Sequence, residues 1–253
     1  FMSQEASDSF ENRTRKLEDK DWNSGHIPWI IDIVSPLGNT TKGIKELKKI
    51  VGDKSLAFSH TWRDKQLEYT FRRALMNKYE VFSVCVSEAL DYTCMYYKTP
   101  LTREEKQKLL HAYRALPPFN DVISSIKQLN DFGYRLFAFS NGSTDMIEEL
   151  LTTAGIKEYF LGIVSVDGVK SYKPDPAVYQ HFLNETAADT DKAWLVSSNP
   201  FDVMGAISAG MKAAWVDRFE NKVFDPWGIE PTLIVKNLYE LKEQVNKYHS
   251  DLQ

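Results

Sequence analysis

The stretch "IIDIVSPLG" (residues 30–38) places one acid, Asp32, in an apolar run just before a turn. From Pro28 to Val34 the chain is apolar and rich in β-branched residues apart from Asp32. This pattern is typical of a strand that is buried on both faces of a parallel sheet. Asp32 is then either a catalytic carboxylate or the acid of an Asx turn, a common role for aspartate after a strand.

Similar short apolar runs recur along the chain, with helical patterns between them. The runs are 135–139, 162–166, 193–196, 213–216 and 232–235, and the helical patterns are 122–132, 144–154, 177–185, 201–209 and 238–248. Glycines at 133, 155 and 210 close three of the helical patterns, as is typical of the left-handed position after a helix. The alternation predicts an α/β fold with a doubly wound parallel sheet.

One long segment interrupts the alternation. From Leu56 to Leu116 there is no strand signal, but three amphipathic helical patterns occur, at 62–78, 81–97 and 102–116, and the last begins with Thr102 and Glu105 in capping-box spacing. Because this insertion follows the first strand, we expect a helical cap above the carboxyl edge of the sheet, where open α/β sheets bind ligands. The predicted domains are an N-terminal arm (1–26), an α/β core (27–48 and 117–253) and a helical cap (49–116).

The composition narrows the class of protein. The chain has 253 residues, 43% of them hydrophobic, which is enough to build a core. With 31 basic and 35 acidic residues its net charge is -4, so we expect no nucleic-acid partner. The chain lacks an apolar run of the roughly 18–20 residues that span a bilayer, so we expect no membrane partner and a cytoplasmic location. Cys85 and Cys94 lie nine positions apart in one helical pattern, on opposite sides, and are expected to be core thiols.

Polar side chains follow each of the first four strands. They are Asp32, then Ser140-Asn141-Gly142, then Asp167 with residues 171–175 (SYKPD), and then residues 197–202 (SSNPFD). Each has a structural alternative: Ser140 and Asn141 could cap the next helix, Lys173 could be a solvated surface lysine, and Asp202 could simply oppose a helix dipole. All of these alternatives would have to hold at the same edge of the same sheet. The joint occurrence of these polar residues at one edge therefore favours a binding or catalytic site.

Several longer motifs carry a resemblance to a known family. They are "WRDKQLEYTFRRALMNKY" (62–79), "FSNGSTDMIEELLTTAGI" (139–156), "SVDGVKSYKPDPAVY" (165–179) and "LVSSNPFDVMGAISAGMKAAWVDR" (195–218). These motifs resemble the haloacid dehalogenase superfamily, and within it the L-2-haloacid dehalogenase branch. The likeness runs from Trp29 to about Leu241. It implies a core with a Rossmann-like sheet, a helical cap, and an enzyme that acts on carbon-halogen bonds.

The resemblance also implies roles for individual residues. Asp32 would attack the carbon that bears the halogen and displace halide, and water would then hydrolyse the ester. Arg63 would receive the halide or the substrate carboxylate, a task that suits a planar, permanently charged group. Asn141 would assist the halide, Ser140 would hold the carboxylate, and Lys173 would balance the charge of Asp32.

The remaining implied residues orient these groups or line the pocket. Those that orient the lysine, the nucleophile and the water are Tyr179, Ser197, Asn199 and Asp202. Phe82 would line the pocket, and the other candidate substrate-binding residues are Tyr179, Asp64, Leu67, Phe201, Val34 and Ser35. The implied substrate is a small carboxylic acid, and the branch commonly dimerises through the cap, so a homodimer is expected.

The acids that would hold a metal ion are not present in the sequence. Phosphatases of the superfamily need a second aspartate two residues after the nucleophile and further acids at the fourth strand end to hold Mg²⁺. Here Val34 and the run Ser197-Ser198-Asn199 stand in those places. We therefore expect a site without metal or cofactor, in which Lys173 balances Asp32, and phosphoryl transfer is disfavoured.

Two departures from the family keep other functions open. The family usually has an aromatic residue and then Gly-Thr-Leu after the nucleophile, whereas this chain has Val34-Ser35-Pro36-Leu37, and Pro36 offers neither a hydroxyl nor an N–H. Asp64 stands where glutamine is common. If Asp64 faces the cleft, a lyase could use Asp32 and Asp64 as acid and base; if it points outward, it is a solvated residue. A non-catalytic binding protein on the same fold is a third alternative.

Overall fold

The computed structural model describes residues 28–31, 47–114, 117–218 and 223–251. In these residues six parallel strands form one sheet in the order β3-β2-β1-β4-β5-β6. The strands are β1 (Pro28–Ile31), β2 (Arg135–Ser140), β3 (Gly162–Ser165), β4 (Trp194–Ser197), β5 (Lys212–Val216) and β6 (Leu233–Val235). The strand order reverses between β1 and β4, where Ile31 pairs with Val196, and such a switch point is where open sheets bind ligands.

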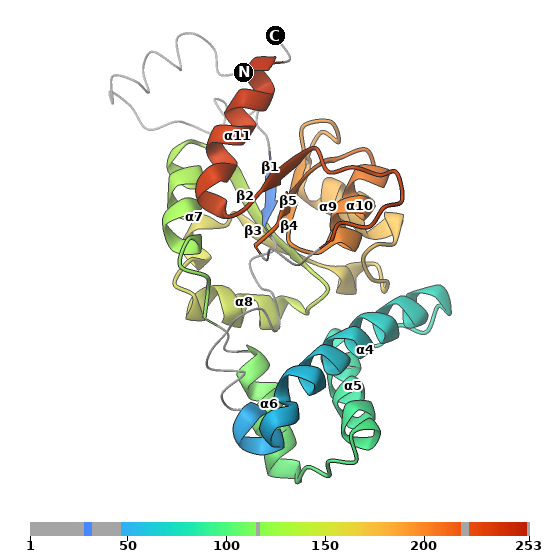
Figure 1. Cartoon of the computed structure of the whole chain (residues 1–253). Coiled ribbons are helices and arrows are strands. Elements are labelled where there is room, and N and C mark those ends of the chain that lie inside the picture. The colour runs from blue at the N-terminus through green and yellow to red at the C-terminus, as the bar shows by residue number, and fades with distance from the viewer. Residues whose placement is uncertain (1–27, 32–46, 115–116, 219–222, 252–253) are drawn as a thin grey trace.

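Helices cover both faces of this sheet because side chains alternate along each strand. On β2, Phe137 and Phe139 belong to one apolar cluster with α9 (Pro176–Thr186) and α10 (Pro200–Ser208), whereas Leu136 and Ala138 belong to a second cluster on the opposite face. That second cluster contains residues of α7 (Val122–Asp131), α8 (Thr144–Thr153) and α11 (Leu238–Asp251). Figure 1 shows these two groups of helices on either side of the strands. The predicted doubly wound α/β fold is confirmed.

The ends of these elements follow the sequence pattern to within a few residues. The three glycines expected after helices, Gly133, Gly155 and Gly210, have φ angles of 88°, 66° and 85°, in the left-handed region. Asp121, just before α7, connects three elements through hydrogen bonds. Its carboxylate accepts two hydrogen bonds from Arg218, after β5, and one from the backbone N–H of Leu238, the first residue of α11.

The inserted helices form a separate layer below the sheet (Figure 1). They are α4 (Ser55–Leu75), α5 (Phe82–Tyr96) and α6 (Arg103–Arg114). The capping box before α6 is confirmed, because the N–H of Thr102 donates to Glu105 Oε2 at 2.8 Å and the N–H of Glu105 donates to Thr102 Oγ1 at 3.2 Å. The boundaries predicted between cap and core stay a prediction.

The first cap helix begins at Ser55, earlier than the expected start at Trp62. Phe58 and Trp62, one turn apart, are both buried, and Trp62 Nε1 donates to the carbonyl of Val86 on α5 at 2.9 Å. The buried stripe of α4 therefore extends one turn further back than the pattern suggested. Although α4 has 21 residues, charges recur along it, and within the described residues no helix is both long and apolar enough to cross a membrane. Cys85 and Cys94 are free and buried, as expected.

Candidate active site

Lys173 is the most deeply buried cation of the site. It lies between β3 and α9 and is 3% exposed. Its Nζ is 2.9 Å from Asp202 Oδ2 and donates to the carbonyl of Phe139 at 3.1 Å. The same Nζ sits 3.9 Å from the centroid of the Phe139 ring. A buried ammonium is tolerated only with such partners, so the alternative of a solvated surface lysine is wrong.

Asp202 is held from its other side by Tyr179. Asp202 lies in the first turn of α10, and its Oδ1 accepts a hydrogen bond from the Tyr179 hydroxyl at 2.9 Å. Burial, together with the neighbouring Asp202 charge, raises the pKa of Tyr179 well above its ordinary value, so the phenol stays a donor. Tyr179 thus holds the Asp202 carboxylate in place, and this carboxylate in turn holds the Lys173 ammonium. A direct contact between Tyr179 and substrate stays a prediction.

The loop after β2 is bonded to Lys173 through its backbone. Asn141 Oδ1 accepts a hydrogen bond from the N–H of Lys173 at 3.1 Å, and Ser140 Oγ accepts one from the N–H of Gly142 at 3.1 Å. The next helix, α8, instead has Ser143 at its N-cap position, so the suggestion that Ser140 and Asn141 cap it is wrong. With its oxygen held by Lys173, the amide of Asn141 keeps its NH₂ group as a donor for an anion.

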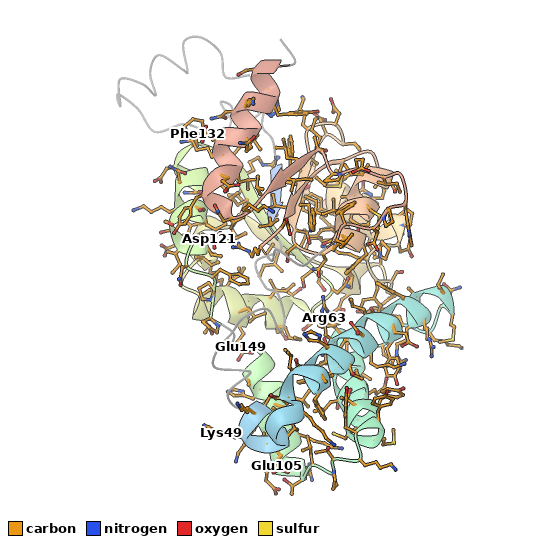
Figure 2. All side chains as sticks on the ribbon, in the orientation of Figure 1. Lys49, Arg63, Glu105, Asp121, Phe132 and Glu149 are labelled. Atoms are coloured by element: carbon orange, nitrogen blue, oxygen red, sulfur yellow. The ribbon has the colours of Figure 1, made fainter. Side chains whose placement is uncertain are left out.

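The cap reaches this edge of the sheet through one face of α4. Arg63 points from α4 toward the core (Figure 2), and its Nη2 donates to Asn199 Oδ1 at 3.3 Å. Two helical turns later, Phe71 packs edge to face on Phe201, with ring centroids 5.3 Å apart. Leu67 lies between Arg63 and Phe71 at the same helical spacing and is half-buried. This face of α4 therefore covers the loop between β4 and α10.

The other candidates occupy the surroundings of these groups. Ser197, at the end of β4, is fully buried, and its Oγ accepts a hydrogen bond from the N–H of Asn199 at 3.1 Å. Phe82 begins α5 and is buried, with its ring centroid 6.5 Å from that of Tyr172. Asp64 is exposed.

Part of the predicted site lies outside the described residues. This part comprises Asp32, Val34 and Ser35, and their roles stay predictions. Among the residues that the structure does describe, no three His, Cys, Asp or Glu side chains come together in a way that could hold a metal ion. The described site brings together one buried lysine, one arginine and two asparagines, a set that suits an anionic substrate.

The sequence analysis assigned no individual role to three residues near the site. Tyr79 and Tyr172 join the cap to the core beside Lys173, and Asp167 accepts the hydrogen bond from Tyr79. The position of Asp167 after a strand was a visible signal. Tyr172 stands in the strand-end run 171–175, but an aromatic residue in a helical or loop pattern predicts core packing equally well, so neither tyrosine received a role.

A family model described as haloacid dehalogenase-like hydrolase matches residues 60–216, more than half of the chain. The chain belongs to the haloacid dehalogenase-like hydrolases. The matched segment contains Arg63, Asn141, Lys173 and Asp202, and the resemblance stated from the motifs is confirmed. A second model, of the RTX toxin acyltransferase family, matches residues 1–72, a share of the chain too small to show membership of that family.

Several proteins to which this hydrolase is similar are named as 2-haloacid dehalogenases. It is 37% identical over 185 residues to an (S)-2-haloacid dehalogenase of Pseudomonas sp. (strain YL), a match that covers 73% of this chain and 79% of the relative. It is 32% identical over 212 residues to one from Pseudomonas putida, covering 84% and 93%. The L-2-haloacid dehalogenase from Xanthobacter autotrophicus, solved with chloropropionic acid covalently bound, matches with a TM-score of 0.78 and 25% identity, covering 87% of this chain and 98% of that one.

Proposed function

We propose that this hydrolase is an (S)-2-haloacid dehalogenase that acts on a small 2-halogenated carboxylic acid. The observation that carries the proposal is the contact between Arg63 of the cap and Asn199 of the core. It brings a permanently charged guanidinium over the sheet edge that also holds Lys173. A carboxylate and a departing halide are both anions, and such a site stabilises both. The named activity of the relatives supports the same chemistry.

The proposed reaction has two steps. A carboxylate oxygen of Asp32 attacks C2 of the substrate, the carbon-halogen bond breaks, and halide leaves with its electron pair. Water then attacks the carbonyl carbon of the resulting ester, which releases a 2-hydroxy acid and restores the carboxylate. Because C2 is attacked once, from the side opposite the halogen, an (S)-2-haloacid gives an (R)-2-hydroxy acid.

Lys173, Asn141 and Arg63 act on the charges of this reaction. The Lys173 ammonium balances the attacking carboxylate, and its own bonds to Phe139 and Asp202 keep it in place. The Asn141 amide and the Arg63 guanidinium donate to the halide, and Ser140 donates to the substrate carboxylate. These donors are already oriented by their protein partners, so little reorganisation is needed as charge develops.

The proposal predicts that oxygen from water enters the protein. In a single turnover of (S)-2-chloropropionate in heavy-oxygen water, we expect halide release measured by ion chromatography and one heavy oxygen in the peptide that contains Asp32, measured by mass spectrometry. Asp32→Asn should abolish both, because an amide is a poor nucleophile. As a control, Asp189→Asn at an exposed ion pair should retain both.

The same experiment separates the lyase alternative. A lyase that used Asp64 as an acid or base would leave Asp32 unlabelled and lose its activity in Asp64→Asn. The exposure of Asp64 beside the half-buried Arg63 favours the dehalogenase. A cytoplasmic location and a homodimer formed through the cap are further parts of the proposal. The exposed Met95 and Tyr96, at the end of α5, offer an apolar surface for such a dimer.

A further inference from the structure

The turn between α4 and α5 is bonded to the core at two points beside Lys173. The Tyr79 hydroxyl donates to the carboxylate of Asp167, which lies in a single 3-10 turn (Val166–Gly168) after β3. In the opposite direction, the Tyr172 hydroxyl donates to the carbonyl of Glu80. The two bonds hold both ends of the segment 167–172, and this segment leads directly into Lys173.

Aromatic packing joins the same two segments. The ring of Tyr172 is fully buried, and its centroid lies 5.1 Å from that of Tyr79 and 6.5 Å from that of Phe82. Cys85 Sγ lies 3.6 Å from the Tyr172 hydroxyl. The residue next to Lys173 therefore forms the surface on which the cap turn rests, and the same ring contacts Phe82, the proposed wall of the pocket.

A chain of hydrogen bonds continues from Asp167 into the loop after β2. The N–H of Asp167 donates to Ser165 Oγ at 3.1 Å, and Ser165 Oγ donates to the carbonyl of Gly142 at 2.7 Å. The N–H of Gly142 in turn donates to Ser140 Oγ at 3.1 Å. Ser165 is buried, so water competes little for these bonds. A contiguous path thus runs from a cap tyrosine to the loop that carries Ser140 and Asn141.

Both tyrosines act as donors in this arrangement. Burial raises the pKa of Tyr79 above its ordinary value, and the hydrogen bond to Asp167 raises it further. Burial likewise raises the pKa of Tyr172. The phenols therefore keep the protons that these bonds require, and a hydrogen bond to a charged carboxylate is about twice as strong as one between neutral groups.

We propose that the Tyr79–Asp167 hydrogen bond is a cap latch that positions the loop 140–142 through Ser165 and Lys173 through Tyr172. Tyr79, Asp167, Ser165 and Tyr172 are positioning residues, because they act through the groups that bind substrate. Because of the latch, the position of the cap and the positions of the anion-binding groups are coupled. Its effect on catalysis rests on the proposed dehalogenase function, whereas the coupling itself does not.

The coupling is tested without substrate by hydrogen exchange and mass spectrometry. Tyr79→Phe removes only the phenol oxygen and keeps the ring. We expect amides of 140–142 and 165–173 to exchange about tenfold faster in this variant, the change that corresponds to losing one hydrogen bond to a charged group. The matched control is Tyr97→Phe, which removes a hydroxyl bonded at 3.0 Å to Thr61 Oγ1 within the cap, and should leave both segments unchanged.

The kinetic test separates positioning from a structural role. With (S)-2-chloropropionate, Tyr79→Phe and Asp167→Ala should lower kcat/KM about tenfold, mainly by raising KM, because fewer molecules hold the binding-competent arrangement. Asp167→Asn should retain most of the activity, since its amide oxygen still accepts from the phenol. A purely structural role would lower the thermal midpoint of these variants and leave KM unchanged.

Two results would overturn the latch. One is unchanged exchange at 140–142 in Tyr79→Phe, and the other is an equal loss of activity in Asp167→Asn and Asp167→Ala. If the wild-type protein releases no halide but exchange at 140–142 responds to Tyr79→Phe as expected, the latch stands and the dehalogenase proposal fails. The two proposals therefore fail on different observations.

Discussion

Lys173 carries its charge where only 3% of its surface meets water. The Lys173 ammonium donates hydrogen bonds to the Phe139 carbonyl and the Asp202 carboxylate. The Tyr179 hydroxyl in turn donates to the Asp202 carboxylate. Such a pair adds little net stability over apolar packing, because both charges lose their hydration. Its value lies in fixing the Lys173 ammonium at the carboxyl edge of the sheet, at the position where the site needs a cation.

Asp202→Asn tests this arrangement. The variant leaves the Lys173 ammonium buried without its counter-ion, so we expect the free energy of unfolding to fall by about 3–5 kcal/mol, measured by urea denaturation. As a matched control, Asp189→Asn removes the exposed Lys192–Asp189 pair and should change that free energy by about 1 kcal/mol or less. An equally small effect of Asp202→Asn would show that Lys173 does not depend on Asp202.

At the scale of elements, α9 and α10 are held together closely enough that one position accepts only glycine. Gly205 lies inside α10, and a Cβ built there would overlap the Tyr179 hydroxyl and lie 2.6 Å from its Cζ. Helix propensity alone favours alanine over glycine by about 1 kcal/mol. The close approach of Tyr179, which holds Asp202, reverses that preference.

Gly205→Ala is therefore expected to destabilise the protein by about 1–3 kcal/mol, the usual effect of overpacking a core, and to lower halide release by displacing Tyr179. Thermal denaturation and a halide assay measure the two effects. The control is Gly162→Ala at the start of β3, where a Cβ would make an ordinary contact of 3.5 Å with the Phe137 ring. A gain in stability from Gly205→Ala would contradict the close approach.

The elements themselves were predictable because local patterns determine them. Alternating runs and helical stripes lie within short stretches of sequence, and the capping box at Thr102 and Glu105 is a local contact. The rule that strand ends share an edge also grouped Asn141, Lys173 and Asp202, which the structure joins by hydrogen bonds. The cap latch escaped prediction, because Tyr79 and Asp167 are 88 positions apart and meet only when the cap lies on the core.

At the scale of the whole molecule, different contacts are found at the two edges of the sheet. The carboxyl edge gathers charged and amide groups. Near the amino end of β4, Trp194 packs edge to face against Tyr248 and His249 of α11, with ring centroids 5.3 Å and 6.2 Å away. Within the part of the chain that the structure describes, the buried Nε2 of His249 has no hydrogen-bond partner. The end of α11 is thus attached to the sheet by ring packing around a histidine whose neutral form is favoured by burial.

This attachment predicts a loss of stability in mild acid. Burial, and secondarily the charge of Lys212, lowers the pKa of His249 below its ordinary value of 6.5. Between the lowered value and 6.5 the unfolded chain binds more protons than the folded one, so the free energy of unfolding should fall as the pH drops through this window. Because His249 is only partly buried, we expect its contribution to the free energy of unfolding to be below about 1 kcal/mol. This contribution is measured as the difference between the free energies of unfolding obtained from urea denaturation at pH 7.5 and at pH 5. His249→Gln should reduce this dependence of stability on pH. The control His111→Gln, at an exposed position on α6, should keep it. An equal pH dependence in the wild type and in both variants would assign the acid sensitivity to other groups.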